Sequence, residues 1–116
     1  MNRRAVGTKY EAAAAAYLEK EGYQIIEKNF YGRHGEIDLI AKDGCCLVFI
    51  EVKYRKNQGS GMPWEAVDRR KQQRLIVTAK EYVAVRNLPL EISYRFDVVS
   101  ILGDSITLYK NAFGII

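Results

Sequence analysis

The sequence EIDLIAKDGCCLVFIEVKY (residues 36–54) contains two apolar runs separated by a short polar segment. The runs over 36–41 and 46–54 are rich in isoleucine, valine and aromatic residues, which favour strands. Asp43-Gly44 between them is a strong signal for a tight hairpin turn. The segment therefore predicts an antiparallel β-hairpin at the centre of the chain.

A two-residue turn at Asp43-Gly44 fixes which residues of the hairpin face one another. Residues opposite each other point to the same side of the sheet, and side chains alternate along each strand. The predicted pairs are Lys42 with Cys45, Asp38 with Phe49, and Glu36 with Glu51. Asp38 is then diagonal to Glu51, at about 7–8 Å or less.

This register collects four charged side chains on one face of the hairpin. They are Glu36, Asp38, Glu51 and Lys53. The apolar residues predicted on the other face are Ile37, Leu39, Val48, Ile50 and Val52. A slip of one residue would scatter the charged set across both faces, so the prediction depends on the register.

Three carboxylates on one surface repel one another unless a cation lies between them. Asp38 and Glu51, with the backbone carbonyl of Val52, would form a half-site of hard oxygen ligands suited to Mg²⁺ or Mn²⁺. Lys53 would lie beside the metal, where it could hold an attacking water or stabilise a pentavalent phosphate. The pattern thus favours phosphoryl chemistry.

The same pattern has a second interpretation, a solvated strand face balanced by surface ion pairs. The apolar side chains of Leu47 and Phe49 fall on that face and argue against plain solvation. Patterning alone leaves both interpretations open.

The remaining elements place the hairpin in a mixed α/β domain. Thr8 and Glu11 have the spacing of a capping box, and Gly22 is a natural helix stop. The predicted elements are a helix over Lys9–Glu21, strands over 23–31, 36–41 and 46–54, a helix over Pro63–Arg86, and strands over 92–102 and 105–109. Residues 57–62 are predicted to form a loop. At 116 residues the chain is expected to be a single domain over 1–116.

Composition excludes several classes of protein. Hydrophobic residues make up 48% and charged residues 28%, which excludes disorder. No apolar run approaches the roughly 20 residues of a membrane span, and three glutamates interrupt the N-terminal region that resembles a signal peptide. We therefore expect a cytoplasmic protein with no membrane partner.

Positive charge is concentrated in one part of the chain. The net charge is +4, but residues 51–80 carry +5 and the rest of the chain −1. Such a local excess is typical of a polyanion binder. The residues predicted to contact nucleic-acid phosphates are Arg55, Arg69, Arg70, Lys71 and Arg74. Lys71 lies within an apolar helical stripe, so it could instead snorkel along the packed surface.

Asp97 is the one acidic residue of the strand predicted over 92–102. Its immediate neighbours in the strand are apolar, and a buried charge needs a partner. We expect it to satisfy a structural hydrogen bond or ion pair rather than to act in catalysis.

The segments GEIDLI (residues 35–40) and VFIEVKYR (residues 48–55) resemble the signature of the PD-(D/E)XK nucleases. Nearly the whole chain resembles the YraN family, bacterial proteins regarded as endonucleases and similar to archaeal Holliday junction resolvases. The resemblance implies a restriction-endonuclease-like core, a mixed five-stranded sheet flanked by helices in the order α-β-β-β-α-β-β. Ile37 stands where the superfamily motif has proline.

The resemblance also implies roles for individual residues. Asp38 and Glu51 would bind Mg²⁺ or Mn²⁺, Lys53 would be the catalytic lysine, and Glu11 would project into the site from the first helix. For Glu11 the capping box remains an alternative. Glu36 would either assist metal binding or only stand beside the site.

The sequence therefore predicts a Mg²⁺-dependent endonuclease acting on branched or structured DNA, of the kind used in repair and recombination. A homodimer is expected because symmetric cutting of a four-way junction needs two sites. One alternative is a non-catalytic nucleic-acid-binding module of nuclease ancestry. Another is an assembly subunit whose residues 113–116 dock on a second protein.

Overall fold

The computed structural model describes residues 3–55, 68–89 and 91–113. A five-stranded sheet with strand order β1-β2-β3-β4-β5 separates two helices. Its elements are α1 (Arg3–Lys20), β1 (Gln24–Tyr31), β2 (Glu36–Asp43), β3 (Cys46–Arg55), α2 (Arg69–Val85), β4 (Tyr94–Leu102) and β5 (Ser105–Phe113). The β3–β4 pair is parallel and the other pairs are antiparallel. The predicted order α-β-β-β-α-β-β is confirmed, and this mixed sheet is compatible with a restriction-endonuclease-like core.

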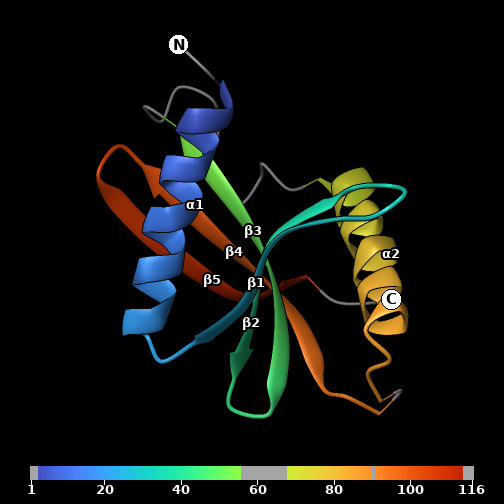
Figure 1. Cartoon of the computed structure of the whole chain (residues 1–116). Helices are drawn as coiled ribbons and strands as arrows, with labels where there is room; N and C mark the ends of the chain where they lie inside the picture. The colour runs from blue at the N-terminus through green and yellow to red at the C-terminus, as the bar shows by residue number, and fades with distance from the viewer. Residues whose placement is uncertain (1–2, 56–67, 90, 114–116) are drawn as a thin grey trace.

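Each helix covers one face of the sheet, with α1 and α2 on opposite sides (Figure 1). On the α1 side, Ala14 and Leu18 pack with Leu39, Val48 and Ile50. The α2 side is more aromatic, and its core residues include Phe30, Phe49, Leu75, Tyr82 and Phe96. Because both faces of β2 and β3 are buried, these strands read as nearly continuous apolar runs.

The first helix begins earlier than predicted. α1 starts at Arg3, so Thr8 and Glu11 lie in its interior and the predicted capping box is wrong. The residues before Thr8 favour or tolerate a helix, and Gly7 costs only about 1 kcal/mol. Gly22 ends the helix as predicted: it has a φ of 96°, and Tyr23 N–H donates to the Leu18 carbonyl at 2.9 Å.

The second helix begins at Arg69 rather than at Pro63. Asp68 is its N-cap, with an extended backbone and a carboxylate that accepts from Lys71 N–H at 2.8 Å. Residues 56–67, which include the predicted loop and the predicted start of this helix, lie outside the described residues. The helix ends at Val85, one residue before the predicted end.

The hairpin register differs from the predicted one by two residues. Asp43 pairs with Cys46, so Gly44 and Cys45 form the turn, and Lys42 faces Leu47. Gly44 has a φ of 62°, and it occupies the first turn position, where a two-residue hairpin requires such a conformation. A shift of two residues preserves the alternation of faces, because the side-chain period is two.

One residue departs from the predicted faces. Ile37 was expected on the side of Leu39, yet it packs in the α2-side core with Phe30, its partner on β1. The pairing of β2 with β3 ends at Leu39 and Ile50. Because Ile37 lies beyond the last pair, its side chain need not follow the alternation of faces along the paired part of β2.

The last two strands differ from the prediction at their ends. β4 begins at Tyr94 instead of Ile92, and β5 continues to Phe113 instead of ending at Tyr109. The longer β5 is stabilised by pairing with β4, and the ring of Phe113 stacks on that of Phe96 at 4.8 Å. Residues 114–116, the rest of the predicted docking segment, lie outside the described residues.

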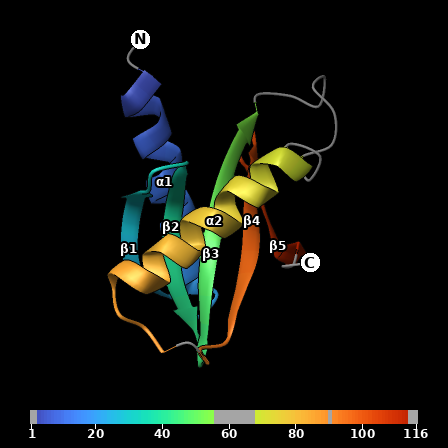
Figure 2. The same ribbon diagram turned by 90° about the vertical axis from the view of Figure 1, so that its right-hand side faces the viewer.

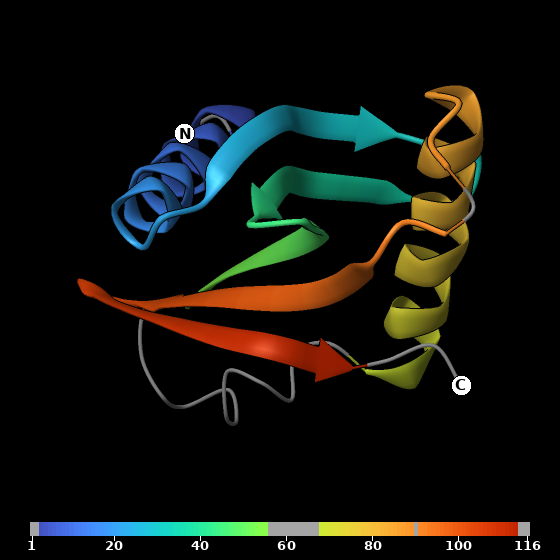
Figure 3. The same cartoon turned by 90° about the horizontal axis from the view of Figure 1, so that it is seen from below.

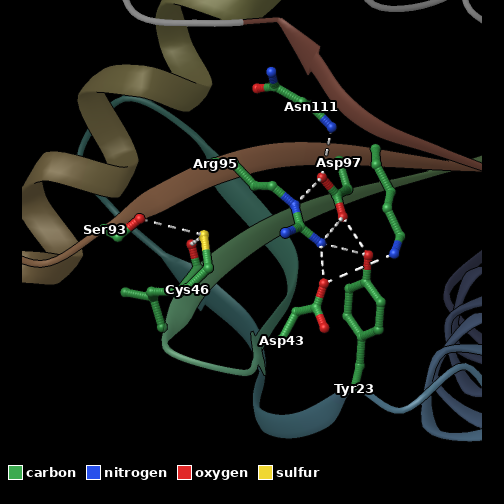
Figure 4. A network of polar contacts seen from close by, with 9 residues as sticks. Tyr23, Asp43, Cys46, Ser93, Arg95, Asp97 and Asn111 are labelled. Carbon is green, nitrogen blue, oxygen red and sulfur yellow. Dashed lines mark hydrogen bonds and ion pairs between the residues drawn. The ribbon is translucent and has the colours of Figure 1, made fainter.

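Asp97 is a structural residue, as predicted. It is 1% exposed and accepts hydrogen bonds from the Tyr23 hydroxyl at 2.7 Å and from Asn111 N–H at 2.9 Å. Arg95 forms an ion pair with it at 3.0 Å and also contacts Asp43 at 2.6 Å (Figure 4). The network joins the start of β1, the hairpin and β5, and its buried charges are paired.

The helices of the described residues are all too short or too polar to cross a membrane.

Candidate functional site

The candidate site lies where β2 and β3 stop pairing. Their pairing runs from the hairpin to Leu39 and Ile50, and the next positions hold Asp38 and Glu51. Beyond that point Val52 N–H donates to the carboxylate of Asp38, at 2.8 Å. The two strands diverge away from the hairpin while α2 crosses in front of them (Figure 2). A side chain from each helix reaches this region, Glu11 from α1 and Lys71 from α2.

Two lysines meet the carboxylate of Glu51. Lys71 Nζ, from α2, lies 2.8 Å from Glu51 Oε1, and Lys53 Nζ lies 3.6 Å from the same oxygen. Glu51 is 6% exposed, so these lysines compensate a nearly buried charge. Lys71 therefore reaches the carboxylate site instead of snorkelling along the packed surface.

Glu11 reaches the site from α1, as the resemblance implied. In the orientation of its amide that places the nitrogen toward the two carboxylates, Asn29 donates to Glu11 Oε1 at 2.9 Å and to Glu36 Oε2 at 3.3 Å. Asn29 has a φ of 56°, a conformation that asparagine adopts more readily than most residues. Sequence reasoning did not identify Asn29 as a site residue, because no local signal marks a positive φ within a strand.

A cavity of about 190 Å³ opens over this cluster. Glu36, Asp38 and Glu51 line it from the sheet, and Lys71 and Arg74 line it from α2. The carboxylates predicted to gather therefore line one cavity, despite the shift in register.

Burial and mutual repulsion alter the pKa values of the site. Burial, together with the nearby charge of Glu51, raises the pKa of Asp38 to about 8. Burial and the charge of Glu36 raise the pKa of Glu11. These shifts show that the carboxylates are held together at an electrostatic cost, which is common at functional sites.

The two lysines respond to the site in opposite ways. Burial lowers the pKa of Lys53, helped by its neighbour Lys71. Burial also disfavours the charge of Lys71, but the attraction of Glu51 outweighs it and raises the pKa of Lys71. Lys71 is thus the firmly charged partner of Glu51, and Lys53 is the more easily deprotonated one.

The donors suit a hard divalent ion, although the set is small. Among residues 3–55, 68–89 and 91–113, no three His, Cys, Asp or Glu side chains together form a group that could hold a metal. Asp38 and Glu51, with the Val52 carbonyl, are all oxygen donors. Mg²⁺ keeps several waters and needs only one or two carboxylates, so this donor set fits it.

The predicted phosphate contacts divide into two groups. Arg70 and Arg74 are exposed on α2, and both line a shallow cavity beside His34. Arg69 is exposed at the start of the same helix. Arg55 ends β3 and is half-buried, and it is not among the residues that line these cavities.

The turn between β1 and β2 is held against α2 by two glycines. Gly32 lies so close to Glu81 that an added Cβ would stand 2.5 Å from its carboxylate, and a Cβ at Gly35 would stand 3.2 Å from the Thr78 hydroxyl. Arg33 N–H donates to Glu81 Oε1 at 3.0 Å. This contact sets the turn beside Arg70 and Arg74, and only the tertiary packing reveals it.

The fold and the site together define a small mixed α/β domain with buried carboxylates and lysines gathered where two central strands separate. The chain belongs to the UPF0102 family. Residues 10–101 match the model described as "Uncharacterised protein family UPF0102".

Curated relatives match along nearly their whole length. A UPF0102 protein of Lachnoclostridium phytofermentans is 48% identical over 97% of this chain and 96% of its own. UPF0102 proteins of Caldanaerobacter subterraneus and Fusobacterium nucleatum are 45% and 41% identical, over 95% and 96% of this chain and 91% and 92% of their own.

Proposed function

We propose that this protein is a metal-dependent phosphodiesterase that cuts nucleic acid, with branched or structured DNA as its substrate. One observation carries the proposal. Asp38 and Glu51, from two neighbouring strands, line one cavity with Lys71 and Arg74 of α2. Lys53 contacts Glu51, and Glu11 of α1 lies close enough to interact with these carboxylates.

The arrangement is difficult to explain by stability alone. Asp38 and Glu51 are 8% and 6% exposed, and burying neighbouring carboxylates costs free energy unless a cation compensates them. The apolar cores on both faces of the sheet do not need this cluster. A site that keeps such a cost in the fold is a candidate for binding and chemistry.

The side chains divide the work as follows. Asp38 and Glu51, with the Val52 carbonyl and Glu11 nearby, would hold Mg²⁺ or Mn²⁺. When bound, that ion neutralises the scissile phosphate and lowers the pKa of a bound water. Lys53 would orient the attacking water or stabilise the charge that develops on the phosphate. Lys71, charged at the cavity wall, would contact a phosphate oxygen of the substrate.

The resemblance to the PD-(D/E)XK nucleases supports the same assignment. The acidic residue of β2 and the Glu-x-Lys pair of β3 stand at matching positions, Asp38, Glu51 and Lys53. Similarity to Holliday junction resolvases favours branched DNA as substrate. Two cuts in a four-way junction require two sites, so a homodimer is part of the proposal.

Cleavage assays test the proposal directly. Linear, nicked, flapped and four-way DNA, and an RNA hairpin, are incubated with native protein and Mg²⁺ or Mn²⁺. We expect cleavage of branched DNA that Asp38→Asn and Lys53→Met both reduce by 10²-fold or more. Asp104→Asn, the same change in an exposed turn, is the matched control and should retain activity. Product that none of the variants alters would come from a contaminant and would defeat the assignment.

A non-catalytic nucleic-acid-binding module is the second candidate. The contact of Lys71 with Glu51 favours it, because the ammonium already compensates that carboxylate. Calorimetry with Mn²⁺ distinguishes the two. Binding that Asp38→Asn abolishes supports the enzyme, whereas DNA binding by a native protein with no affinity for Mn²⁺ supports the module.

A further inference from the structure

Three cavities among the described residues follow one another across the molecule. The central one lies over Asp38 and Glu51. It shares Arg74 with a shallow cavity of about 310 Å³ on the outer side of α2, and Glu36 with a cavity of about 280 Å³ between α1 and β1. The shared residues make the three cavities neighbours, with the carboxylate site in the middle.

The two flanking cavities differ in charge. Among the side chains that the structure describes, the outer cavity of α2 is lined by Arg70, Arg74 and His34 and by no carboxylate. Within the same described part of the chain, the cavity between α1 and β1 is lined by Glu11 and Glu36 and by no basic residue. A phosphate is attracted to the first and repelled from the second. Nucleic acid crossing the site would therefore place backbone at the α2 end and something other than phosphate at the β1 end.

The cavity at the β1 end has an exposed aromatic side chain at its edge. Tyr31, the last residue of β1, is 64% exposed although it lines this cavity. It pairs with Glu36 across the β1–β2 ladder, so its ring lies on the same side of the sheet as a carboxylate of the site. Figure 3 shows the end of β1 passing into the turn that meets α2. A largely exposed ring adds little to the core, which leaves it available to a ligand.

The polar groups beside this ring match the edge of a nucleobase. The amide hydrogens of Asn29 are engaged by Glu11 and Glu36, which leaves its carbonyl oxygen as an acceptor. The carboxylates of Glu11 and Glu36 have further lone pairs that accept hydrogen bonds from amino groups such as those of adenine and cytosine. An aromatic ring offers a stacking surface for any base. The repulsion of phosphate and the attraction of a neutral base edge both favour a nucleobase as the ligand of this cavity.

We infer that the cavity beside Tyr31 receives the base of an unpaired nucleotide adjacent to the scissile phosphate, with that base stacked on the Tyr31 ring. The inference rests on the proposed function and deepens it by naming what distinguishes branched from fully paired DNA. A base inside a duplex is stacked and paired, so only a nucleotide at a branch, flap or frayed end reaches the cavity without the cost of extrusion.

Binding in EDTA tests the inference separately from cleavage. The probe is a flapped DNA with 2-aminopurine as the first unpaired base, compared with a duplex of the same length. We expect the native protein to quench the probe's fluorescence and to bind the flap more tightly than the duplex. Tyr31→Ala should abolish the quenching and weaken flap binding by about 5- to 150-fold, with duplex binding unchanged.

Two controls identify the cause of any loss. Tyr31→Phe keeps the ring and should retain both the quenching and the preference for the flap. Val85→Ala removes another exposed apolar side chain, at the end of α2, and should change neither. If Tyr31→Ala weakens the binding of flap and duplex equally, or changes neither, the inference is overturned, although the native protein still binds DNA. A native protein that binds neither substrate defeats the inference together with the proposed function.

Discussion

Lys71 Nζ of α2 lies 2.8 Å from Glu51 Oε1 of β3 and joins the basic helix to the carboxylate site. Asp68 is the N-cap of α2, and its carboxylate accepts a hydrogen bond from Lys71 N–H. This contact fixes the position of the Lys71 backbone relative to the sheet. Glu51 is a proposed metal ligand, so a divalent ion and the Lys71 ammonium would compete for one carboxylate. The relationship makes the charge of Lys71 a determinant of metal affinity.

Replacing Lys71 by methionine should raise the affinity for Mn²⁺. The change keeps the length of the side chain and removes the competing charge, and we expect tighter binding by about tenfold. Isothermal titration calorimetry measures it. Lys80→Met, on the exposed side of the same helix, serves as the control and should leave the affinity unchanged. Weaker binding after Lys71→Met would show that the lysine supports the ion rather than competes with it.

The stability of the protein in EDTA should fall as the pH rises toward 8. The pKa of Asp38 is raised to about 8 in the folded state, from an ordinary value near 4, so the folded protein binds the extra proton between these values. Stability is then full below about pH 4 and is lost as the pH rises through about 8, by a few kcal/mol. Urea unfolding at pH 5 and pH 8.5 checks this. Asp38→Asn should flatten the dependence, and parallel curves for the two proteins would contradict the assignment.

Two variants of Asn29 should distinguish the stability that its hydrogen bonds contribute from the stability that its backbone conformation contributes. Its amide bonds two carboxylates, and its φ is 56°. Asn29→Ala loses both the hydrogen bonds and the residue's tolerance of this conformation, and should lower the free energy of unfolding by about 2–4 kcal/mol. Asn29→Gly keeps the backbone relaxed and should lose about 1 kcal/mol less. Denaturant titration of both variants measures the difference. Equal losses would mean that the positive φ carries no cost for alanine here.

The network around Asp97 should contribute to stability through its hydrogen bonds. Tyr23→Phe removes one donor to a buried carboxylate and should cost about 1–2 kcal/mol. Asp97→Ala leaves Arg95 without one of its anions and should cost about 3–5 kcal/mol. Thermal or urea unfolding measures both. Asp104→Ala, in an exposed turn, should stay within about 0.5 kcal/mol of the native protein. A change at Tyr23 no larger than this control would exclude a role for its hydroxyl.

Most of the fold could be predicted from local patterns. The order of elements, the hairpin and the stop at Gly22 follow from residue periodicity and turn chemistry, which act over a few neighbours. The errors lie at element ends and in the register. The Thr8–Glu11 spacing satisfies a capping box, but helix propensity continues upstream to Arg3. Asp43-Gly44 predicts a turn, but this dipeptide does not determine whether the glycine is the first or the second of the two turn residues. In the structure it is the first.

The sequence by itself determined that Asp38 and Glu51 share a side of the sheet, because alternation has a period of two and survives a shift of two. Only the tertiary structure decided which groups meet them. Asn29 joins Glu11 to Glu36, Lys71 reaches Glu51, and Tyr31 borders the neighbouring cavity. These contacts depend on where β2 leaves β3 and on how each helix packs across the sheet. Both result from the balance of core packing and charge over the whole chain, which no local pattern encodes.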